Sequence, residues 1–209
     1  MRRMMLAALA VCLLMVGACK KAPERPGRER EETRMTESAS GKKVLMVIAK
    51  RDFRDEELFE TRRVLESGGV EVTVASSSLD EAVGMLRGKA KADVLLQDAK
   101  ATEYDAVVFV GGSGASEYWD SAVAHALATE AAQAGKVVAA ICIAPVTLAR
   151  AGLLKGKKAT VFQSQKADLT TGGASYTGRP VEVDGRIVTA DGPGSAAQFG
   201  EAILKALAE

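Results

Sequence analysis

The sequence predicts an α/β domain with a mainly parallel sheet, and three observations support this fold class. Apolar runs such as Lys43–Ala49 and Lys136–Ile141 show no alternation of polar and apolar residues, which is typical of strands buried on both faces. Segments with helical spacing lie between such runs. Glycines close several of these segments. Alternation of strands and helices favours a parallel sheet covered on both faces, with the active cleft at the carboxyl ends of its strands.

Each expected element has a local reason. Helix Glu56–Glu66 carries acidic residues in its first turn and ends at Gly68-Gly69, helix Ser116–Ala134 is rich in Ala and ends at Gly135, and helix Pro145–Ala151 begins with Pro and ends at Gly152. Apart from the two runs above, buried strands are expected at Val70–Ala75, Asp105–Val110 and Lys158–Phe162. The segment Val181–Thr189, with Asp184-Gly185 at its centre, predicts a hairpin, and Ala196–Leu207 an amphipathic helix. Residues 79–101 suit either a small hairpin or a short helix.

Composition narrows the possible functions. The 209 residues, 47% of them hydrophobic, are enough for one domain with a real core. The 28 basic and 27 acidic residues give a net charge of +1, which excludes the basic excess of a nucleic-acid binder. One His and three Cys exclude a His-rich metal site and the usual zinc clusters. No phosphate-binding loop or complete dinucleotide motif occurs, so we expect neither a cofactor nor a metal.

The first 41 residues have the pattern of a targeting segment. Two arginines precede an apolar stretch that is shorter than the roughly 20 residues of a membrane-spanning helix. The segment Val16–Cys19 resembles the lipobox of bacterial lipoproteins, which implies a signal peptide over residues 1–18 and a lipid on Cys19. Residues 19–41 are charged and suit a flexible tether, and residues 42–209 form the domain. We therefore expect a lipid-anchored protein of the cell envelope, on the periplasmic face of the outer membrane.

Cys142 is the first candidate for chemistry, because removal of the signal and acylation of Cys19 leave it as the one free thiol of the mature chain. It lies between the strand Lys136–Ile141 and the helix that begins near Pro145. At such a turn the unpaired N–H groups of the helix favour the thiolate. A buried structural cysteine is the alternative, and position alone does not decide between them.

The residues around Cys142 also resemble a known family. The run Val137–Phe162, with Ala-Ile-Cys, a Pro three residues on and Ala-Gly-Leu-Leu-Lys-Gly, is similar to the nucleophile region of the DJ-1/PfpI superfamily. The resemblance extends to Phe53–Leu58, Val110–Gly112, Val183–Gly185 and Asp191–Gly194. It implies a flavodoxin-like three-layer sandwich that is usually dimeric.

The resemblance also implies roles for individual residues. Cys142 matches the reactive cysteine, and Glu57 matches the glutamate that contacts it, with Glu56 as the fallback. A protonated carboxyl would donate a hydrogen bond to the thiolate, whereas an ionised one would raise the pKa of the thiol, and both alternatives stay open. Gly112 matches the glycine whose N–H, with that of Ile143, forms an oxyanion hole.

The sequence departs from the family at the position of the catalytic base. Many hydrolase-like members place His directly after the Cys, where this chain has Ile143. Other members have His downstream, where this chain has Phe162. The one histidine, His125, lies in the Ala-rich helix and is expected to be exposed and outside the site. Tyr118 and Trp119 are interpreted as packing or dimer-surface residues.

Two hypotheses for function remain. In the first, Cys142 attacks a reactive carbonyl or acyl substrate while Glu57 moves the proton, in chemistry similar to that of glyoxalases, deglycases or amidases. In the second, the chain is a redox sensor or binding domain of the stress response, and Cys142 is oxidised rather than catalytic. We favour the first and expect a homodimer.

Overall fold

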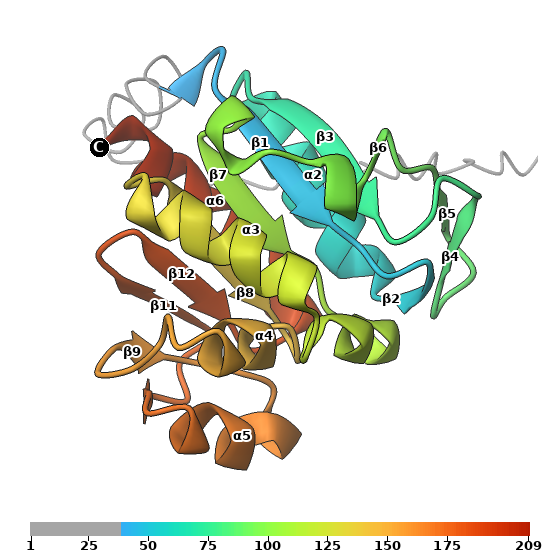
Figure 1. Cartoon of the computed structure of the whole chain (residues 1–209). Helices are drawn as coiled ribbons and strands as arrows, with labels where there is room; N and C mark the ends of the chain where they lie inside the picture. Colours follow the sequence, from blue (N-terminus) through green and yellow to red (C-terminus); the bar gives the residue numbers. More distant parts are fainter. Residues whose placement is uncertain (1–38) are drawn as a thin grey trace, which may run out of the picture.

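The computed structural model describes residues 39–209. The expected signal peptide, the lipidated Cys19 and residues 20–38 of the tether lie outside the described residues. None of the helices within residues 39–209 is both long and apolar enough to cross a bilayer. The chain from Lys42 onwards forms the α/β domain shown in Figure 1.

A seven-stranded sheet forms the centre of the domain, in the order β11-β12-β8-β7-β1-β3-β6. Its strands are β1 (Lys43–Val47), β3 (Glu71–Ser76), β6 (Val94–Leu95), β7 (Ala106–Phe109), β8 (Val137–Ile141), β11 (Val181–Asp184) and β12 (Ile187–Ala190). All neighbours pair in parallel except the hairpin of β11 and β12. Strands β1, β7 and β8 are adjacent, so their carboxyl ends lie together at one edge.

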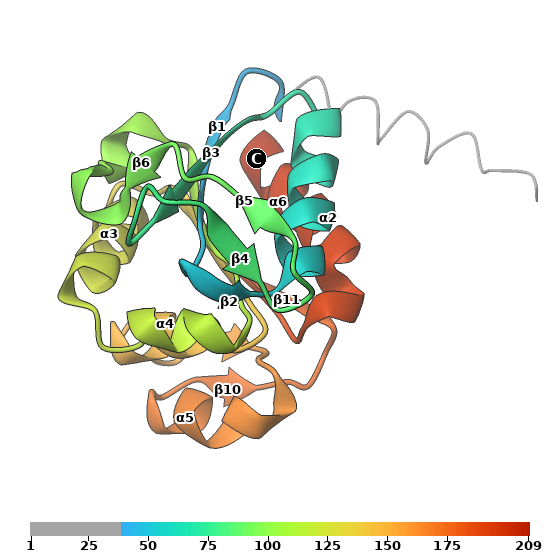
Figure 2. The ribbon, with the colours of Figure 1, turned by 90° about the vertical axis from the view of Figure 1, so that its right-hand side faces the viewer.

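Helices cover both faces of this sheet. The helices are α2 (Asp55–Ser67), α3 (Ala122–Gln133), α4 (Pro145–Arg150), α5 (Lys166–Thr171) and α6 (Ala196–Ala208). Figure 2 shows α2 and α6 on one side of the sheet and α3 and α4 on the other. The core accordingly divides into two clusters, one with Leu58 and Phe199 beneath α2 and α6, the other with Leu127 and Leu148 beneath α3 and α4.

Two small sheets lie outside the central sheet. One consists of β2 (Arg51–Phe53), β4 (Ala82–Gly84) and β5 (Lys89–Ala90), and the other of β9 (Lys158–Ala159) and β10 (Ser175–Tyr176). The carboxylate of Asp55, at the start of α2, accepts hydrogen bonds from the N–H groups of Leu86 (2.8 Å) and Gly88 (2.6 Å). This helix therefore holds the turn between β4 and β5 in place.

The predicted fold class, a three-layer α/β sandwich with a mainly parallel sheet, is confirmed. The strands of the sheet other than β6, and the hairpin at Asp184-Gly185, lie where the sequence predicts them, within one or two residues. Residues 79–101 form the hairpin of β4 and β5, followed by the short strand β6. The hairpin alternative for this segment is therefore confirmed.

No element is predicted from the sequence at β2, β10 or α5, and two of the predicted elements have other bounds in the structure. The helix predicted at Ser116–Ala134 is split: a 3₁₀ segment covers Ser113–Tyr118, and α3 begins after Ser121, whose side chain accepts a hydrogen bond from Ala124 N–H (3.3 Å). The strand predicted at Lys158–Phe162 stops at Ala159. Beyond it, Thr160 N–H donates to the side-chain oxygen of Thr189 (2.9 Å) and Phe162 N–H donates to the carbonyl of Cys142 (2.8 Å). Strand β9 therefore ends before these residues.

Candidate functional site around Cys142

The candidate residues lie at one edge of the sheet, where three adjacent strands end. Cys142 directly follows β8, and Gly111 and Gly112 follow β7 by two and three residues. Glu57 lies in the first turn of α2, which the chain enters from β1 through β2. The structure thus brings together Cys142, Glu57, Gly112 and Ile143, the set singled out in the sequence.

The backbone of Cys142 has a strained conformation. Its φ angle is 63°, in the left-handed region that residues with a side chain rarely adopt. Two hydrogen bonds hold it there: Cys142 N–H donates to the Ala190 carbonyl (2.9 Å), and the Cys142 carbonyl accepts from Phe162 N–H (2.8 Å). Such strain persists only where the surroundings fix it, and it marks functional turns. The side chain is buried, with 7% of the residue exposed.

Glu57 is the carboxylate of the site. It is completely buried, and its Oε2 accepts a hydrogen bond from Gly111 N–H (2.9 Å). Its carboxyl group also interacts with the Cys142 thiol. A Cβ atom on Gly111 would lie 2.5 Å from both Cys142 Cβ and Glu57 Oε2, so the pair requires glycine between its two members.

Glu56 lies elsewhere. Its Oε1 accepts a hydrogen bond from the Arg54 guanidinium (2.9 Å), and the two side chains form an ion pair on the outer side of the helix start. The structure therefore places Glu57, and not the fallback Glu56, beside the thiol.

The loop from β2 packs tightly against the glycines after β7. Arg54 N–H donates to the Gly111 carbonyl (2.9 Å). Gly112 has a φ of 99°, and a Cβ atom there would overlap the carbonyl of Asp52 and the N–H of Arg54. Asp52 itself adopts a φ of 57°. These contacts fix the direction in which the Gly112 peptide points.

Two backbone donors face the sulfur. The N–H groups of Gly112 and Ile143 both act on the Cys142 sulfur and lower its pKa. An oxyanion formed by attack of this sulfur would arise next to the same donors, which is the arrangement of an oxyanion hole. The pattern matches the role implied by the sequence resemblance.

Burial dominates the electrostatics of the pair. Desolvation raises the pKa of Glu57 to about 7, against the smaller lowering effects of Cys142, Gly111 and Arg54. Desolvation, followed by the charge of Glu57, raises the pKa of Cys142 to about 12. The expectation that the helix N-terminus makes the thiolate the favoured form is therefore wrong in net direction, because burial and the neighbouring carboxylate outweigh the N–H donors.

These two groups titrate as one unit. The buried pair releases a first proton near pH 7 and a second near pH 12, because two adjacent buried negative charges repel each other. Between these values the pair retains one proton. That proton lies on the sulfur of Cys142, beside the ionised carboxylate of Glu57.

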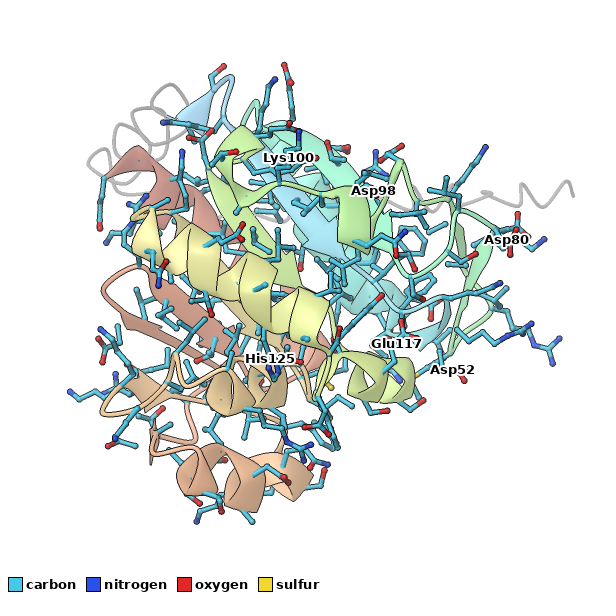
Figure 3. All side chains as sticks on the ribbon, viewed as in Figure 1. Asp52, Asp80, Asp98, Lys100, Glu117 and His125 are labelled. Atoms are coloured by element: carbon cyan, nitrogen blue, oxygen red, sulfur yellow. The ribbon has the colours of Figure 1, made fainter. Side chains whose placement is uncertain are left out.

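A chain of contacts through Trp119 supports Ile143. Its carbonyl accepts a hydrogen bond from the indole N–H of Trp119 (3.1 Å), and the Arg150 guanidinium stacks 5.2 Å from the Trp119 ring centroid. His125 Nε2 donates to the Trp119 carbonyl (2.8 Å). Figure 3 shows His125 on α3 where this helix meets α4. His125 is half-buried rather than exposed as predicted, and Trp119 packs against the residue after the nucleophile.

Tyr118 has a packing role, as interpreted from the sequence. Its buried hydroxyl donates to the Ile48 carbonyl (2.9 Å) and accepts from Ser77 N–H (3.1 Å). No cluster of three or more His, Cys, Asp or Glu residues able to hold a metal occurs among residues 39–209.

Comparison with known proteins adds the family. The family model described as DJ-1/PfpI matches residues 42–206, which is most of the chain. The chain belongs to the DJ-1/PfpI family.

The relatives in this family cover nearly the same domain. An uncharacterized protein of Methanocaldococcus jannaschii is 48% identical over 174 residues, covering 82% of this chain and 85% of its own. A protein of Caenorhabditis elegans named glutathione-independent glyoxalase is 29% identical over 169 residues, covering 81% of this chain and 90% of its own. The crystal structure of a ThiJ/PfpI domain protein from Brachyspira murdochii has a TM-score of 0.78 at 35% identity and covers 79% of this chain and 95% of that one.

Sequence reasoning missed three parts of this DJ-1/PfpI site. Gly111, rather than Gly112, provides the hydrogen bond to Glu57, and the strand-end pair Gly111-Gly112 was its only signal. The support of Ile143 by Trp119 depends on tertiary packing and left no signal in the sequence. The strain at Cys142 also had none.

The raised pKa of Glu57 predicts a pH-dependent loss of stability. The folded chain binds this proton more tightly than the unfolded chain, whose carboxyl has its ordinary pKa of 4.5. The stability that this tighter proton binding contributes is therefore complete below about pH 4.5, and it is lost as the pH rises through 7. Between pH 4 and pH 8, the free energy of unfolding of Glu57→Gln should increase by about 3 kcal/mol relative to that of the wild type.

Urea unfolding at a series of pH values measures this difference. Glu56→Gln is the matched control, since the same change is made one residue away and outside the pair. A difference between Glu57→Gln and the wild type that stays constant from pH 4 to pH 8 would contradict the assigned burial of charge.

Proposed function

We propose that this chain is a cysteine-dependent enzyme acting on small reactive carbonyl compounds, with glyoxalase-like chemistry. The observation that carries the proposal is the buried carboxyl of Glu57 beside Cys142, with the N–H groups of Gly112 and Ile143 facing the same sulfur. A nucleophile, a proton carrier and an oxyanion site are the groups that addition to a carbonyl requires. The name of the C. elegans relative supports the same reaction class.

The first step adds sulfur to an aldehyde. The ionised carboxylate of Glu57 takes the proton of the Cys142 thiol, and the resulting thiolate attacks the aldehyde carbon of a 2-oxoaldehyde. A C–S bond forms, and the electrons of the C=O bond move to oxygen. The N–H groups of Gly112 and Ile143 stabilise this oxyanion, which then takes a proton to give a hemithioacetal. Glu57 is the proton donor in this proposal, because its pKa of about 7 suits transfer in both directions at neutral pH.

The following steps need only water. Two protons then move, with Glu57 and water as carriers: the one on the hemithioacetal carbon passes to the neighbouring carbonyl carbon, and the one on the hemithioacetal hydroxyl passes to the neighbouring carbonyl oxygen. A 2-hydroxyacyl thioester of Cys142 results. Water then attacks the thioester, releasing a 2-hydroxy acid and restoring the thiol. The balance is one 2-oxoaldehyde plus one water giving one 2-hydroxy acid, with no external oxidant or reductant. This route assigns every proton transfer to Glu57 and water, which suits a site with Ile143 and Phe162 at the positions of the family histidines.

Substitution of the pair tests the reaction. We expect Cys142→Ser to lower the conversion of methylglyoxal to lactate at least ~10³-fold, because the hydroxyl is a far weaker nucleophile. Glu57→Gln should lower kcat at least ~10²-fold by removing the proton carrier. Glu56→Gln should retain activity within a factor of about three, since Glu56 pairs with Arg54 instead. Unchanged turnover in Cys142→Ser would refute the mechanism.

An oxidant sensor is the second candidate, and the same donors favour it. The N–H groups of Gly112 and Ile143 would also hold the oxygen of a sulfenic acid on Cys142. Mass spectrometry after mild peroxide treatment separates the two functions. A reversible gain of one oxygen at Cys142, together with no turnover of 2-oxoaldehydes by the wild type, would favour sensing over catalysis.

The proposal places this enzyme at the cell envelope. It is supported by the apolar leader and the lipobox-like segment that ends at Cys19. Expression of the full chain in a bacterium should give a protein in the membrane fraction that is released by Cys19→Ala. Recovery of both forms in the same soluble fraction would contradict a lipid anchor.

A homodimer is proposed through an apolar patch formed by α2 and the hairpin of β4 and β5. Phe59, Met85 and Leu86 are 40%, 43% and 58% exposed, and Phe59 lies against Gly88 of the hairpin. Exposed apolar side chains gathered in this way are typical of interaction sites. Light scattering should show a dimer for the wild type and a monomer for Leu86→Glu. Val183→Glu, at a comparably exposed residue on β11, is the control and should leave the mass unchanged.

A further inference from the structure

A pocket of about 410 Å³, within the size range of small-molecule sites, is lined by residues 161–163, 176, 178 and 191–195. Two of its walls are the segments that hold the backbone of Cys142. Phe162, whose N–H donates to the Cys142 carbonyl (2.8 Å), lies on one wall, and Asp191 and Gly192 follow Ala190, whose carbonyl accepts from Cys142 N–H (2.9 Å). The pocket is therefore tied to the reactive residue by hydrogen bonds on both sides.

The polar groups of this pocket are already paired with each other. The hydroxyl of Tyr176 donates to Gln163 Oε1 (2.7 Å), and the hydroxyl of Ser195 donates to Asp191 Oδ1 (2.6 Å). The Lys166 ammonium lies 5.2 Å from the Tyr176 ring centroid, in cation–π contact with it. Paired groups gain little from a polar ligand, so the binding surface left over is mainly the apolar part of the walls.

Phe162 dominates that apolar part. It is 44% exposed although its own backbone is fixed by the bond to Cys142. A Cβ atom on Gly192 would lie 3.4 Å from the Phe162 ring, so glycine at this position leaves the ring edge clear. Pro193 adds a second apolar surface in the same pocket. An exposed aromatic ring whose backbone is bonded to that of Cys142 favours an apolar ligand group.

We propose that this pocket binds an aryl or branched alkyl substituent of the 2-oxoaldehyde substrate while Cys142 attacks its aldehyde carbon. The inference deepens the proposed function and rests on it for the reaction. A methyl substituent would leave most of the 410 Å³ unfilled, whereas a phenyl ring packs against Phe162 and Pro193. Phe162 is then a specificity-determining residue of the site.

Alkylation of Cys142 tests the pocket without any need for turnover. The sulfur displaces iodide from N-phenyliodoacetamide or from iodoacetamide, and the ratio of the two rates is divided by the same ratio for free cysteine. We expect a preference of about tenfold for the phenyl reagent in the wild type, falling to within about twofold of free cysteine in Phe162→Ala. Leu79→Ala, at a comparably exposed apolar residue, is the matched control and should keep the wild-type ratio.

Saturation-transfer NMR with acetophenone and acetone provides a second readout that needs no reaction at the thiol. Acetophenone signals that weaken in Phe162→Ala but not in Leu79→Ala support the pocket. Equal phenyl preference, or equal acetophenone signals, in the wild type and Phe162→Ala would overturn the inference. If the phenyl preference is present but no 2-oxoaldehyde is turned over, the pocket stands and the proposed reaction fails.

Discussion

The buried pair of Cys142 and Glu57 is the constraint on which the rest of this site depends. Placing a carboxyl and a thiol side by side away from water raises the cost of every negative charge there, so the pair ionises once near neutral pH and again only in strong alkali. Gly111 permits the contact because any side chain at this position would occupy the space between the two groups. The rest of the fold offsets this local cost, and the carboxyl of Glu57 exchanges its proton near pH 7.

The sheet topology explains why such a pair forms. Strands β1, β7 and β8 are neighbours, and each ends at the same edge with one part of the site. The strained turn at Cys142 is fixed by bonds to Ala190 on β12 and to Phe162 beyond β9, so five segments of the chain determine the position of one sulfur. Trp119 completes this support by bonding to the carbonyl of Ile143.

Local patterns in the sequence predicted the parts of the structure that depend on local chemistry. Apolar runs and closing glycines located β1, β8 and α2, and the motif around Cys142 located the nucleophile. Helix α3 starts later than its Ala-rich composition suggests, because the side chain of Ser121 caps it. The net rise in the pKa of Cys142 was not predictable in this way, because burial arises from packing of distant segments and opposes the local helix terminus. The pocket at Phe162 is likewise a product of tertiary structure.

The most direct test of this account is the rate of Cys142 alkylation by iodoacetamide as a function of pH, for the wild type and Glu57→Gln. If Cys142 keeps its proton beside the ionised carboxylate of Glu57, the wild-type rate continues to rise with pH towards the thiol pKa of about 12 and shows no plateau at neutral pH. In Glu57→Gln the midpoint moves to lower pH, because the charge that raises the pKa of the thiol is gone. A wild-type profile with one midpoint near the ordinary thiol value of about 8.5, unchanged in Glu57→Gln, would contradict the coupling of Cys142 to Glu57.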